Sequence, residues 1–411
     1  MKMSRVLCVA AVFWSECAAL QRGFGRGSAR GRSTARLVAA DTVEAAVELM
    51  FPGVSRVVTT EAVDGVSMST VFWSVVEGVS SESPNAASNA AVCFVEADAQ
   101  AMPLLESFAK CCNAAGIAGL AVSAACVGDG VPTLHFAVEA EPFWASAAAP
   151  ATEADTACAV GRVRAWVQDV IVDSKVCPFT SSADVAGTGL SAAGVVPGAV
   201  LYPVCDAAGT GSTAIVGLLG AFWRATVDLL SQPPEDASST LLVAPLFAKG
   251  DYDGFVRGTE IIVRNLQLVG ADDDAALVFF HPNYDRDHPA LKQDRPTHGH
   301  LPPSAWLPAY LRLTRSAEEV DALSAEQLAS ANYQRRAPCA VLNILRADQV
   351  ERAEVVVPSA LIEPTPGRRV RVTGARVYAQ NTWRLATQAT RKTDAQGHEY
   401  LVVSRQQAAD E

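Results

Sequence analysis

The sequence lacks the patterns that mark several familiar classes of site. Its 10 cysteines form no repeated CxxC motif and no Cys/His zinc spacing, and Cys111 and Cys112 are adjacent, which suits no disulfide framework. We therefore expect mostly reduced, buried thiols, which fit a stroma or cytosol better than an extracellular space. Beyond the first dozen or so residues, no apolar run approaches the ~20 residues that a membrane-spanning helix needs. We expect no transmembrane segment in the mature protein.

Positive charge is scarce in the body of the chain. The net charge is -11, but the first 40 residues hold seven Lys and Arg against Glu16 alone, so they carry +6 and residues 41–411 carry -17. Because phosphate contacts need clustered Lys and Arg, we expect no general nucleic-acid binding. The tail after Gly367 is an exception, at +4. There we expect an appended, solvated strand pair, with contact to RNA or anionic lipid as the alternative.

Residues 1–40 have the composition of a two-part targeting sequence, a signal plus a plastid transit peptide. Lys2 and Arg5 precede an apolar stretch and then small residues around Cys17–Ala19, which is the pattern of a secretory signal. The segment 21–40 is rich in Arg, Gly, Ser and Ala and has no acidic residue, as in transit peptides. We predict a plastid protein, in the chloroplast stroma of an alga with a secondary plastid. Mitochondrial import and secretion are the alternatives.

The body of the chain is too long for one ordinary core, and half of its residues are apolar, so we expect two globular units. Residues 41–144 show a mixed pattern typical of a small α+β domain. Its apolar runs at 55–60 and 66–76 favour strands, and the turn residues Gly128–Gly130 separate two more. A linker rich in Ala, Pro, Ser and Thr follows at 145–157.

The second unit, residues 158–353, alternates strands with helices. This pattern predicts an α/β fold, in which a parallel or mostly parallel βαβαβ sheet carries helices on its faces. Ligands in such sheets bind beyond the carboxyl ends of the strands, and His281 lies at such an end. We also expect helices at 316–331 and 339–347. Residues 354–411 form a basic C-terminal extension.

Several short motifs carry a family resemblance. They are Trp166, Cys177-Pro178-Phe179, Thr240-Leu241-Leu242-Val243 with Pro245, Tyr252-Asp253, Phe280-His281-Pro282, Asn332-Tyr333 with Arg336 and Pro338, and Leu345-Arg346. In this order and spacing, residues 158–353 resemble the domain of unknown function 1415 family of bacteria and plastids. The chain departs from the family at Ala244 and Asn343, where the family has histidines. A mechanism that needs those histidines would not operate here.

The resemblance implies that three of these motifs meet in the fold. It makes Cys177, His281 and Arg336 the candidate catalytic residues. A histidine at the carboxyl end of a strand serves in acid–base chemistry or as a ligand. Arginine offers a two-pronged donor for carboxylate or phosphate, so Arg336 and Arg346 are candidate anion binders. The remaining ligand-binding candidates, Asn332 and Tyr333, would position a ligand rather than react with it.

Cys177 has two interpretations. The amphipathic run before it places it at the C-terminal end of a helix, where the helix dipole disfavours a thiolate and the thiol would be structural. If the motifs converge, Arg336 would supply a positive charge and make the thiol reactive or ligand-contacting. Cys-Pro-Phe also resembles the active turn of thioredoxin-like and glutathione-dependent enzymes, in which it opens a helix instead of following one. A thiol-redox protein that uses Cys177 is therefore an alternative function.

The histidines of the long loop after Pro282 are weak candidates for a metal site. His288, His298 and His300 lie among aspartates, but their spacing matches no zinc pattern, so we predict no metal and name no cofactor. The leading interpretation is a plastid enzyme or small-anion-binding protein with a pocket at the carboxyl edge of the sheet. A non-catalytic interaction protein, in which the motifs are packing and turn devices, is the other alternative. Substrate and oligomeric state do not follow from the sequence.

Overall fold

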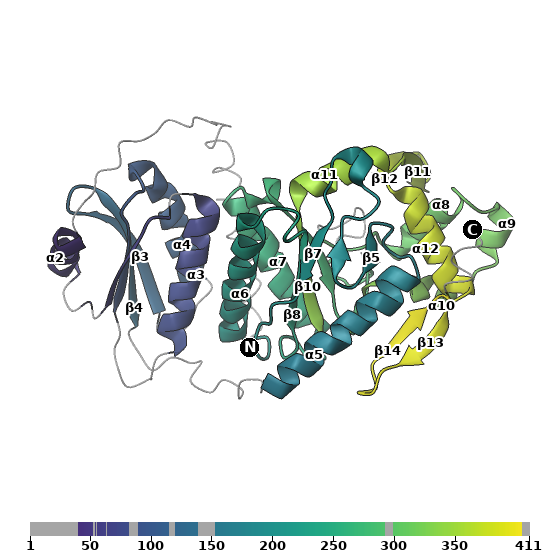
Figure 1. Ribbon diagram of the computed structural model, residues 1–411, viewed down its shortest axis with the longest axis horizontal. Helices are drawn as coiled ribbons and strands as arrows, with labels where there is room; N and C mark the ends of the chain where they lie inside the picture. The colour runs from purple at the N-terminus through teal and green to yellow at the C-terminus, as the bar shows by residue number, and fades with distance from the viewer. Residues whose placement is uncertain are drawn as a thin grey trace. The chain divides into compact units, whose positions relative to one another are not determined.

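Figure 1 shows the computed structural model, which describes residues 40–51, 54, 56–62, 64–81, 89–114, 120–138, 153–291 and 299–404. The chain divides into two compact units. The first consists of the described residues before 149 together with Gly211–Trp223 and Arg264–Ala271, and the second of the remaining described residues. The signal and transit segments expected in residues 1–40 lie outside the described residues except for Ala40. The plastid address therefore stays a prediction.

The described residues before 149 form the small α+β fold that the sequence predicts. Their elements are α2 (Ala40–Met50), β1 (Arg56–Thr60), α3 (Gly65–Ser81), β2 (Ala90–Phe94), a 3-10 turn (Ala99–Ala101), α4 (Met102–Ala114), β3 (Leu120–Val127) and β4 (Val131–Val138). The strands form one sheet in the order β1-β2-β4-β3, with β1 parallel to β2 and the other neighbours antiparallel. Gly128 and Gly130 have φ of 51° and 92°, so the turn between β3 and β4 uses conformations that glycine adopts readily.

One strand expected in this unit is a helix. The apolar run 66–76 lies within α3, which begins where the carboxylate of Asp64 accepts hydrogen bonds from the amides of Val66 and Ser67, each at 2.9 Å. The buried side chains of α3 recur with helical spacing and form one face; they are Met68, Phe72, Trp73 and Val76. The high content of β-branched residues favoured a strand, but the cap and the packing of this face decide for a helix.

The second part of the chain begins with α5 (Glu153–Trp166), which continues without a break as the π-helix η3 (Val167–Asp173). The elements that follow, up to the long loop, are β5 (Thr180–Ser182), β6 (Val185–Ala186), a 3-10 turn (Ser191–Ala193), β7 (Gly198–Leu201), α6 (Ser212–Ser231), β8 (Ser239–Ala244), α7 (Tyr252–Leu268), a 3-10 turn (Ala271–Asp273) and β9 (Ala275–Phe280). Strands and helices alternate as expected, and the α/β class is confirmed. The six strands of the sheet take the order β5-β6-β7-β8-β10-β9.

The tenth strand corrects the prediction of a helix at 339–347. β10 (Ala340–Arg346) lies between β8 and β9 and is antiparallel to both. The sheet is therefore mixed, with a parallel pair only at β7 and β8 among the strands of the second unit. Five of the seven side chains of β10 are buried, because a central strand is covered on both faces. A short, continuous apolar run of this kind has no periodicity that separates a buried strand from a buried helix.

The register gathers several chain segments at one edge of this sheet. Since β10 is antiparallel to β8 and to β9, these two strands run in the same direction as each other and as β7. Ala340, at the start of β10, faces Ala244, at the end of β8, and Val341 faces Phe280, at the end of β9. The segment that leads into β10 therefore meets the loops that leave β8 and β9. We call this edge the carboxyl edge.

After the long loop the chain continues through short helices into the C-terminal extension, whose described part holds two strand pairs and a helix where the sequence predicted one strand pair. The elements after the loop, apart from β10, are η6 (Ser304–Trp306), α8 (Leu307–Leu311), α9 (Ala317–Asp321), α10 (Ala325–Ala329), the 3-10 helix η7 (Ser330–Arg335), α11 (Ala347–Val356), β11 (Ser359–Thr365), β12 (Arg368–Thr373), α12 (Ala375–Thr387), β13 (Thr390–Thr393) and β14 (Glu399–Val402). The helix expected at 316–331 is divided, because Ser316 and Ser324 each start a new helix with a capping box. β11 pairs with β12, and β13 pairs with β14.

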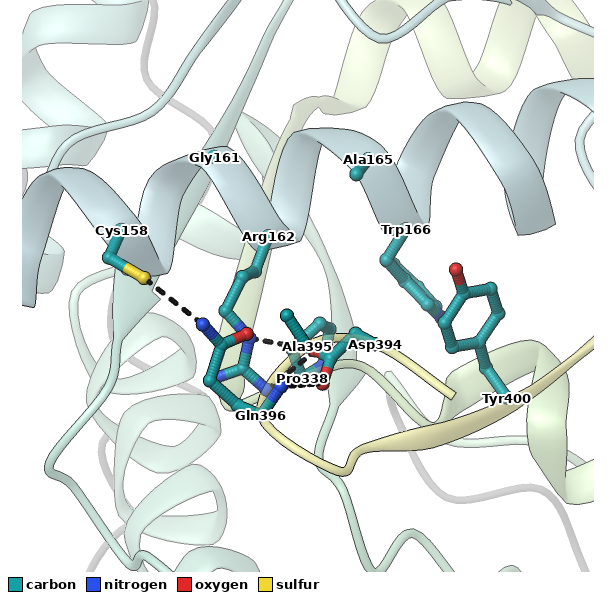
Figure 2. Close-up of a pocket in the computed structure, with 10 residues that line it drawn as sticks. All are labelled: Cys158, Gly161, Arg162, Ala165, Trp166, Pro338, Asp394, Ala395, Gln396 and Tyr400. Carbon is teal, nitrogen blue, oxygen red and sulfur yellow. Dashed lines mark hydrogen bonds and ion pairs between the residues drawn. The ribbon is translucent and has the colours of Figure 1, made fainter. Parts of the chain in front are cut away.

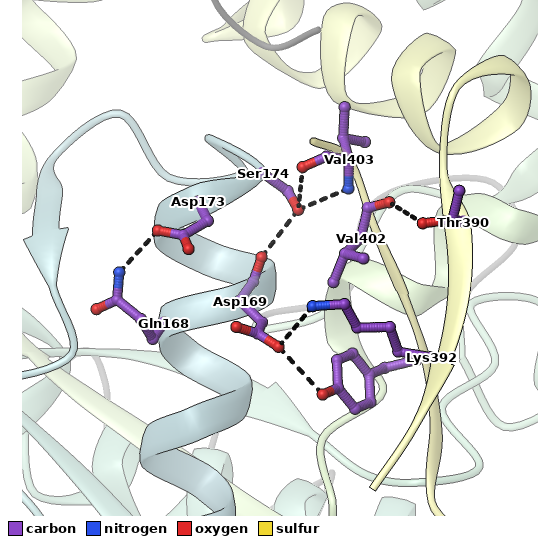
Figure 3. Close-up of polar contacts among 9 residues, drawn as sticks. Gln168, Asp169, Asp173, Ser174, Thr390, Lys392, Val402 and Val403 are labelled. Carbon is purple, nitrogen blue, oxygen red and sulfur yellow. Dashed lines mark hydrogen bonds and ion pairs between the residues drawn. The ribbon is translucent and has the colours of Figure 1, made fainter. Parts of the chain in front are cut away.

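The hairpin β13–β14 packs on the first helix of the second unit. Figure 3 shows Asp169 accepting hydrogen bonds from the ammonium of Lys392 at 3.3 Å, and the hydroxyl of Tyr400 donates to the same carboxylate at 3.1 Å. The side chains of Tyr400 and Val402 join a buried cluster with Trp166 and Phe280, whose rings meet edge-on with centroids 5.1 Å apart. β14 is thus part of the core, whereas every residue of β13 is exposed, so the solvated pair expected from the charge is found for one of the two strands.

Ser174 connects the C-terminal end of η3 to the residue that follows β14. Its buried hydroxyl donates to the carbonyl of Asp169 and accepts from the amide of Val403, both at 2.9 Å (Figure 3). We expect Ser174→Ala to lower the free energy of unfolding by about 2 kcal/mol, because it leaves a buried donor and a buried acceptor without partners. Chemical denaturation measures the loss. Ser231→Ala, which removes an exposed hydroxyl bonded to the carbonyl of Asp228, should cost much less; equal losses would contradict the role of Ser174.

Among the described helices, one passes the length and composition test for a membrane span. It is the window Ala214–Ser231 of α6, and 61% of that window is buried inside the protein. Core helices with this degree of burial pass the same test. The finding is compatible with the expectation that the mature protein has no transmembrane segment.

Candidate functional site

His281 lies at the carboxyl edge, directly after β9, and is fully buried. Its Nδ1 accepts a hydrogen bond from the amide of Asn283 at 3.1 Å, so this nitrogen carries no proton. The proton therefore sits on Nε2, which donates to the carbonyl of Ala248 at 3.0 Å. Burial lowers the pKa of His281 to about 4, which keeps the ring neutral at physiological pH. Both nitrogens thus hold backbone groups of neighbouring turns.

The backbone that His281 holds is strained. Ala248 has φ of 51°, a left-handed conformation that alanine seldom adopts. Its amide donates to the carbonyl of Gly209 at 2.9 Å, while its own carbonyl accepts from His281. The turn after β8 is therefore clamped from two sides, and the histidine helps to impose its shape.

Arg286, which the sequence did not single out, organises the loop after His281. This arginine is almost completely buried and donates from Nε to Oδ1 of Asn332 at 2.9 Å. Its two terminal nitrogens donate to the carbonyls of Ala331 at 3.0 Å and Pro302 at 3.3 Å. Burial lowers the pKa of Arg286 to about 10, so the side chain remains charged at neutral pH. The guanidinium joins the loop after β9 to the segment that leads into β10.

Asn332 and Tyr333 take different places in this junction. Asn332 is buried, with its side-chain oxygen on Arg286 and its amide nitrogen donating to Oδ1 of Asp285 at 3.3 Å. The half-buried Tyr333 presents its ring to the guanidinium of Arg336, whose carbon lies 4.6 Å from the ring centroid. Asn332 therefore connects the segment that leads into β10 to the loop after β9, and the ring of Tyr333 supports the guanidinium of Arg336.

Arg336 is half-buried at the same edge. Its Nε donates to the carbonyl of Tyr284 at 3.2 Å, and its own carbonyl accepts from Nε2 of His398 at 3.2 Å. Within the ranges that the structure describes, its two terminal nitrogens make no hydrogen bond or ion pair. The guanidinium is thus held by one nitrogen and by the Tyr333 ring, with its outer donors available.

The sheet places Cys177 and Arg346 at the opposite edge from His281. β5 and β7 run in the same direction, since β6 is antiparallel to both, and Thr180 is level with Gly198 at the start of β7. Cys177 precedes β5, after the C-terminal end of η3, as its position behind an amphipathic run predicts. Its thiol is half-buried and accepts a hydrogen bond from the hydroxyl of Thr180 at 3.5 Å.

Arg346, at the end of β10, has a structural set of contacts. Its Nε donates to the carbonyl of Ala237 at 2.9 Å, and one terminal nitrogen donates to the carbonyls of Leu229 and Gln232, each at 2.5 Å. A cation at these last carbonyls of α6 complements the negative end of the helix dipole. The expected anion-binding role of Arg346 stays a prediction, and the geometry assigns the side chain a capping contact.

The histidine loop shows no metal centre in its described part. Nε2 of His288 contacts Oδ1 of Asp253 at 2.6 Å, and His300 is buried with its ring stacked on Tyr284. His298 lies outside the described residues. Within those ranges, no three His, Cys, Asp or Glu side chains are grouped so that they could hold a metal ion.

Of the six candidates from the motifs, four meet at the carboxyl edge: His281, Asn332, Tyr333 and Arg336. Cys177 and Arg346 do not join them, and in the described part of the chain no hydrogen bond connects Cys177 with His281 or Arg336. The catalytic and ligand-binding roles stay predictions. Sequence reasoning missed Arg286, because an arginine between two aspartates in a loop carries every mark of an exposed residue.

Comparison with known protein families gives a match to part of the second unit. Residues 159–297 match the model of the family described as protein of unknown function (DUF1415). The matched segment contains Trp166, Cys177 and His281 and ends before Asn332, so it is shorter than the expected 158–353. No curated protein and no solved structure matches the chain. The predicted resemblance is thus confirmed for residues 159–297, which match the DUF1415 family.

Proposed function

We propose that the second unit binds a small anion at the carboxyl edge of its sheet, through Arg336. The observation that carries the proposal is the state of this guanidinium. Its Nε donates to the carbonyl of Tyr284 and its carbon lies 4.6 Å from the centroid of the Tyr333 ring, while its outer nitrogens make no hydrogen bond with the described residues. A planar guanidinium that is already oriented binds carboxylate or phosphate with two parallel hydrogen bonds and loses little side-chain entropy.

The surroundings of Arg336 support this role. The guanidinium of the neighbouring Arg286 donates hydrogen bonds to three oxygens of the protein, so it stabilises the loop and does not serve a ligand. Asn332 fixes the segment that carries Tyr333 and Arg336 against the loop after β9. The donors of Arg336 are therefore set on a rigid frame, which is what a specific anion site requires.

Calorimetric titration of the full chain with inorganic phosphate, pyrophosphate and succinate tests the proposal. We expect one of these anions to bind the wild type, and Arg336→Gln to weaken its binding at least about tenfold, the effect of a lost charge-assisted bidentate contact. Arg336→Lys should recover only part of the affinity, because an ammonium lacks the planar pair of donors.

Arg369→Gln is the matched control, since it removes the same charge from an exposed side chain that is paired with Glu363 on β11. It should leave the affinity unchanged. Equal affinities for wild type and Arg336→Gln, or no binding of the three anions to the wild type, would overturn the proposal.

A second candidate is a non-catalytic interaction protein in which Phe280-His281-Pro282 is a packing device. The two backbone hydrogen bonds of His281 favour this alternative, because they leave neither ring nitrogen for a substrate. The thiol-redox alternative has no comparable support. Cys177 follows the C-terminal end of η3, where the helix dipole offers no stabilisation to a thiolate.

A further inference from the structure

The backbone of Arg336 is held in a tight turn from which its side chain projects. Arg336 has φ of -86° and ψ of 87°, close to the values of the central residue in an inverse γ-turn. The amide of Ala337 closes this turn by donating to the carbonyl of Arg335 at 3.2 Å. The direction in which the Arg336 side chain leaves the backbone therefore depends on how firmly the turn is held.

Three further hydrogen bonds hold this turn, and one of them comes from the β13–β14 hairpin. The amide of Arg336 donates to the carbonyl of Tyr333 at 3.2 Å, and the carbonyl of Arg335 accepts from the amide of His281 at 3.1 Å. The carbonyl of Arg336 accepts from Nε2 of His398 at 3.2 Å. Of these contacts, only the one from His398 uses a side chain, so a single substitution can remove it and leave the turn's other contacts in place.

His398 is a neutral donor to this carbonyl. A carbonyl oxygen only accepts hydrogen bonds, so the proton of the ring lies on Nε2. Burial lowers the pKa of His398, which keeps the ring uncharged at neutral pH. His398 therefore acts on the backbone of Arg336 and adds no second cation to the anion site.

The turn of the hairpin anchors His398 to α5. The amide of His398 donates to Oδ1 of Asp394 at 2.9 Å, and its carbonyl accepts from the amide of Asp394 at 2.9 Å. Figure 2 shows the carboxylate of Asp394 meeting the guanidinium of Arg162, whose Nε and Nη2 lie 2.8 and 2.7 Å from Oδ2. The ring of His398 also stacks on Tyr400, with centroids 6.2 Å apart. A series of contacts thus runs from α5 through the hairpin to Arg336.

We propose that His398 is a positioning residue of the anion site, through which the C-terminal hairpin controls the affinity of Arg336 for its anion. The inference rests on the proposed function of Arg336. A guanidinium makes two parallel hydrogen bonds only in one orientation, so a turn that is free to move costs affinity. The coupling is reciprocal, because an anion that prefers the held turn also stabilises the docked hairpin by the same factor.

Calorimetric titration of the full chain with phosphate, pyrophosphate and succinate measures the coupling. His398→Leu removes the donor and should weaken binding of the anion at least about fivefold, the effect of one lost hydrogen bond. His398→Gln has a side-chain N–H that can take the place of Nε2, so its affinity should lie within about twofold of the wild type. Equal affinities of His398→Leu and the wild type would overturn the proposal, and so would an equal loss in both variants.

Arg391→Gln is the matched control on the same hairpin. It removes one partner of an exposed ion pair with Glu399 and keeps His398 in place. The affinity for the anion should not change. A loss as large as that of His398→Leu would show that any disturbance of the hairpin weakens the site, and would contradict the specific role of His398.

A second measurement reports on Arg336 in the absence of an anion. The Nε–H of Arg336 donates to the carbonyl of Tyr284, so its exchange with water shows how firmly the side chain is held. NMR of the full chain with isotope-labelled arginine follows this signal, which Arg336→Lys identifies by its loss. We expect exchange at least about threefold faster in His398→Leu, and a return to the wild-type rate in His398→Gln.

The two measurements separate the role of His398 from the anion site itself. Equal exchange rates in His398→Leu and the wild type would overturn the positioning role, even if Arg336 binds an anion. A wild type that binds none of the three anions, with faster exchange in His398→Leu, would overturn the proposed anion site and support His398 as the residue that positions Arg336.

Discussion

Replacement of Arg286 by methionine is expected to lower the free energy of unfolding by about 4 kcal/mol. Three buried oxygens, from Asn332, Ala331 and Pro302, would each lose the guanidinium as a donor. Hydrogen bonds to a charged group contribute about 1.5–3 kcal/mol each after the exchange with water is counted. The methionine avoids the burial of a charge, which returns part of the loss. It leaves the carbonyl of Pro302 without a donor, while the carbonyl of Ala331 keeps the side-chain amide of Gln334 at 3.0 Å and Oδ1 of Asn332 keeps the backbone amide of residue 286 at 3.4 Å.

The measurement needs to separate the two compact units of the chain. Hydrogen exchange followed by mass spectrometry, on peptides covering 275–346, reports the stability of the region that Arg286 holds together. Arg312→Met is the matched control, because this exposed arginine pairs with Asp321 at the surface and should cost at most about 1 kcal/mol. If the two variants lost similar protection, Arg286 would not be the organising residue of the junction.

The sequence predicted the class of the fold and most of its alternating elements, because helices such as α7 carry clear periodicity and strands such as β8 are short apolar runs that end at turn residues. The prediction failed where the hydrophobic pattern does not distinguish a strand from a helix. β10 is a short apolar run that is buried on both faces. α3 is rich in β-branched residues, which favour a strand, but the cap at Asp64 starts a helix there. For β10, tertiary packing selects the structure, whereas for α3 the local cap at Asp64 acts together with the packing of its buried face.

The candidate site was predicted to a similar extent. The order of the motifs along the chain predicted that His281, Asn332, Tyr333 and Arg336 lie close together. In the structure each of them flanks a strand at the carboxyl edge. The functions of individual side chains did not follow. Whether a histidine has a free nitrogen depends on turns such as that of Ala248, and whether an arginine is buried, as Arg286 is, depends on the closure of a long loop. Both are long-range properties.

His281 gives the second large prediction, a loss of stability in weak acid. Burial lowers its pKa to about 4 in the folded protein, from 6.5 in the unfolded chain. Above pH 6.5 the ring is neutral in both states, so the stability is fully present there. Between pH 6.5 and about 4 the unfolded chain takes up a proton that the folded protein refuses, so stability falls with pH. At about 1.4 kcal/mol per pKa unit, the loss attributable to this residue is about 3 kcal/mol.

Other groups change stability in the same direction. The amide of Gly254 lowers the pKa of Asp251, and burial lowers the pKa of His398. The contribution of His281 is therefore isolated by comparison with His281→Gln, which does not titrate and can still donate to Ala248. The variant should be less stable than the wild type at pH 7, because the amide of Asn283 loses its acceptor, but its stability should fall less steeply toward pH 4.

Denaturation curves at pH 7, 5.5 and 4.5 for both proteins measure the difference in slope. NMR of the histidine rings measures the titration directly. A ring signal of His281 that titrates near pH 6.5 would contradict the buried, doubly bonded state. It would also revive an acid–base role, because a general base at neutral pH needs a pKa near the operating pH and a nitrogen that reaches the substrate. A neutral ring that stays silent down to about pH 4 would instead identify His281 as the residue that holds the strained turn at Ala248, beside the edge where Arg336 presents its free donors.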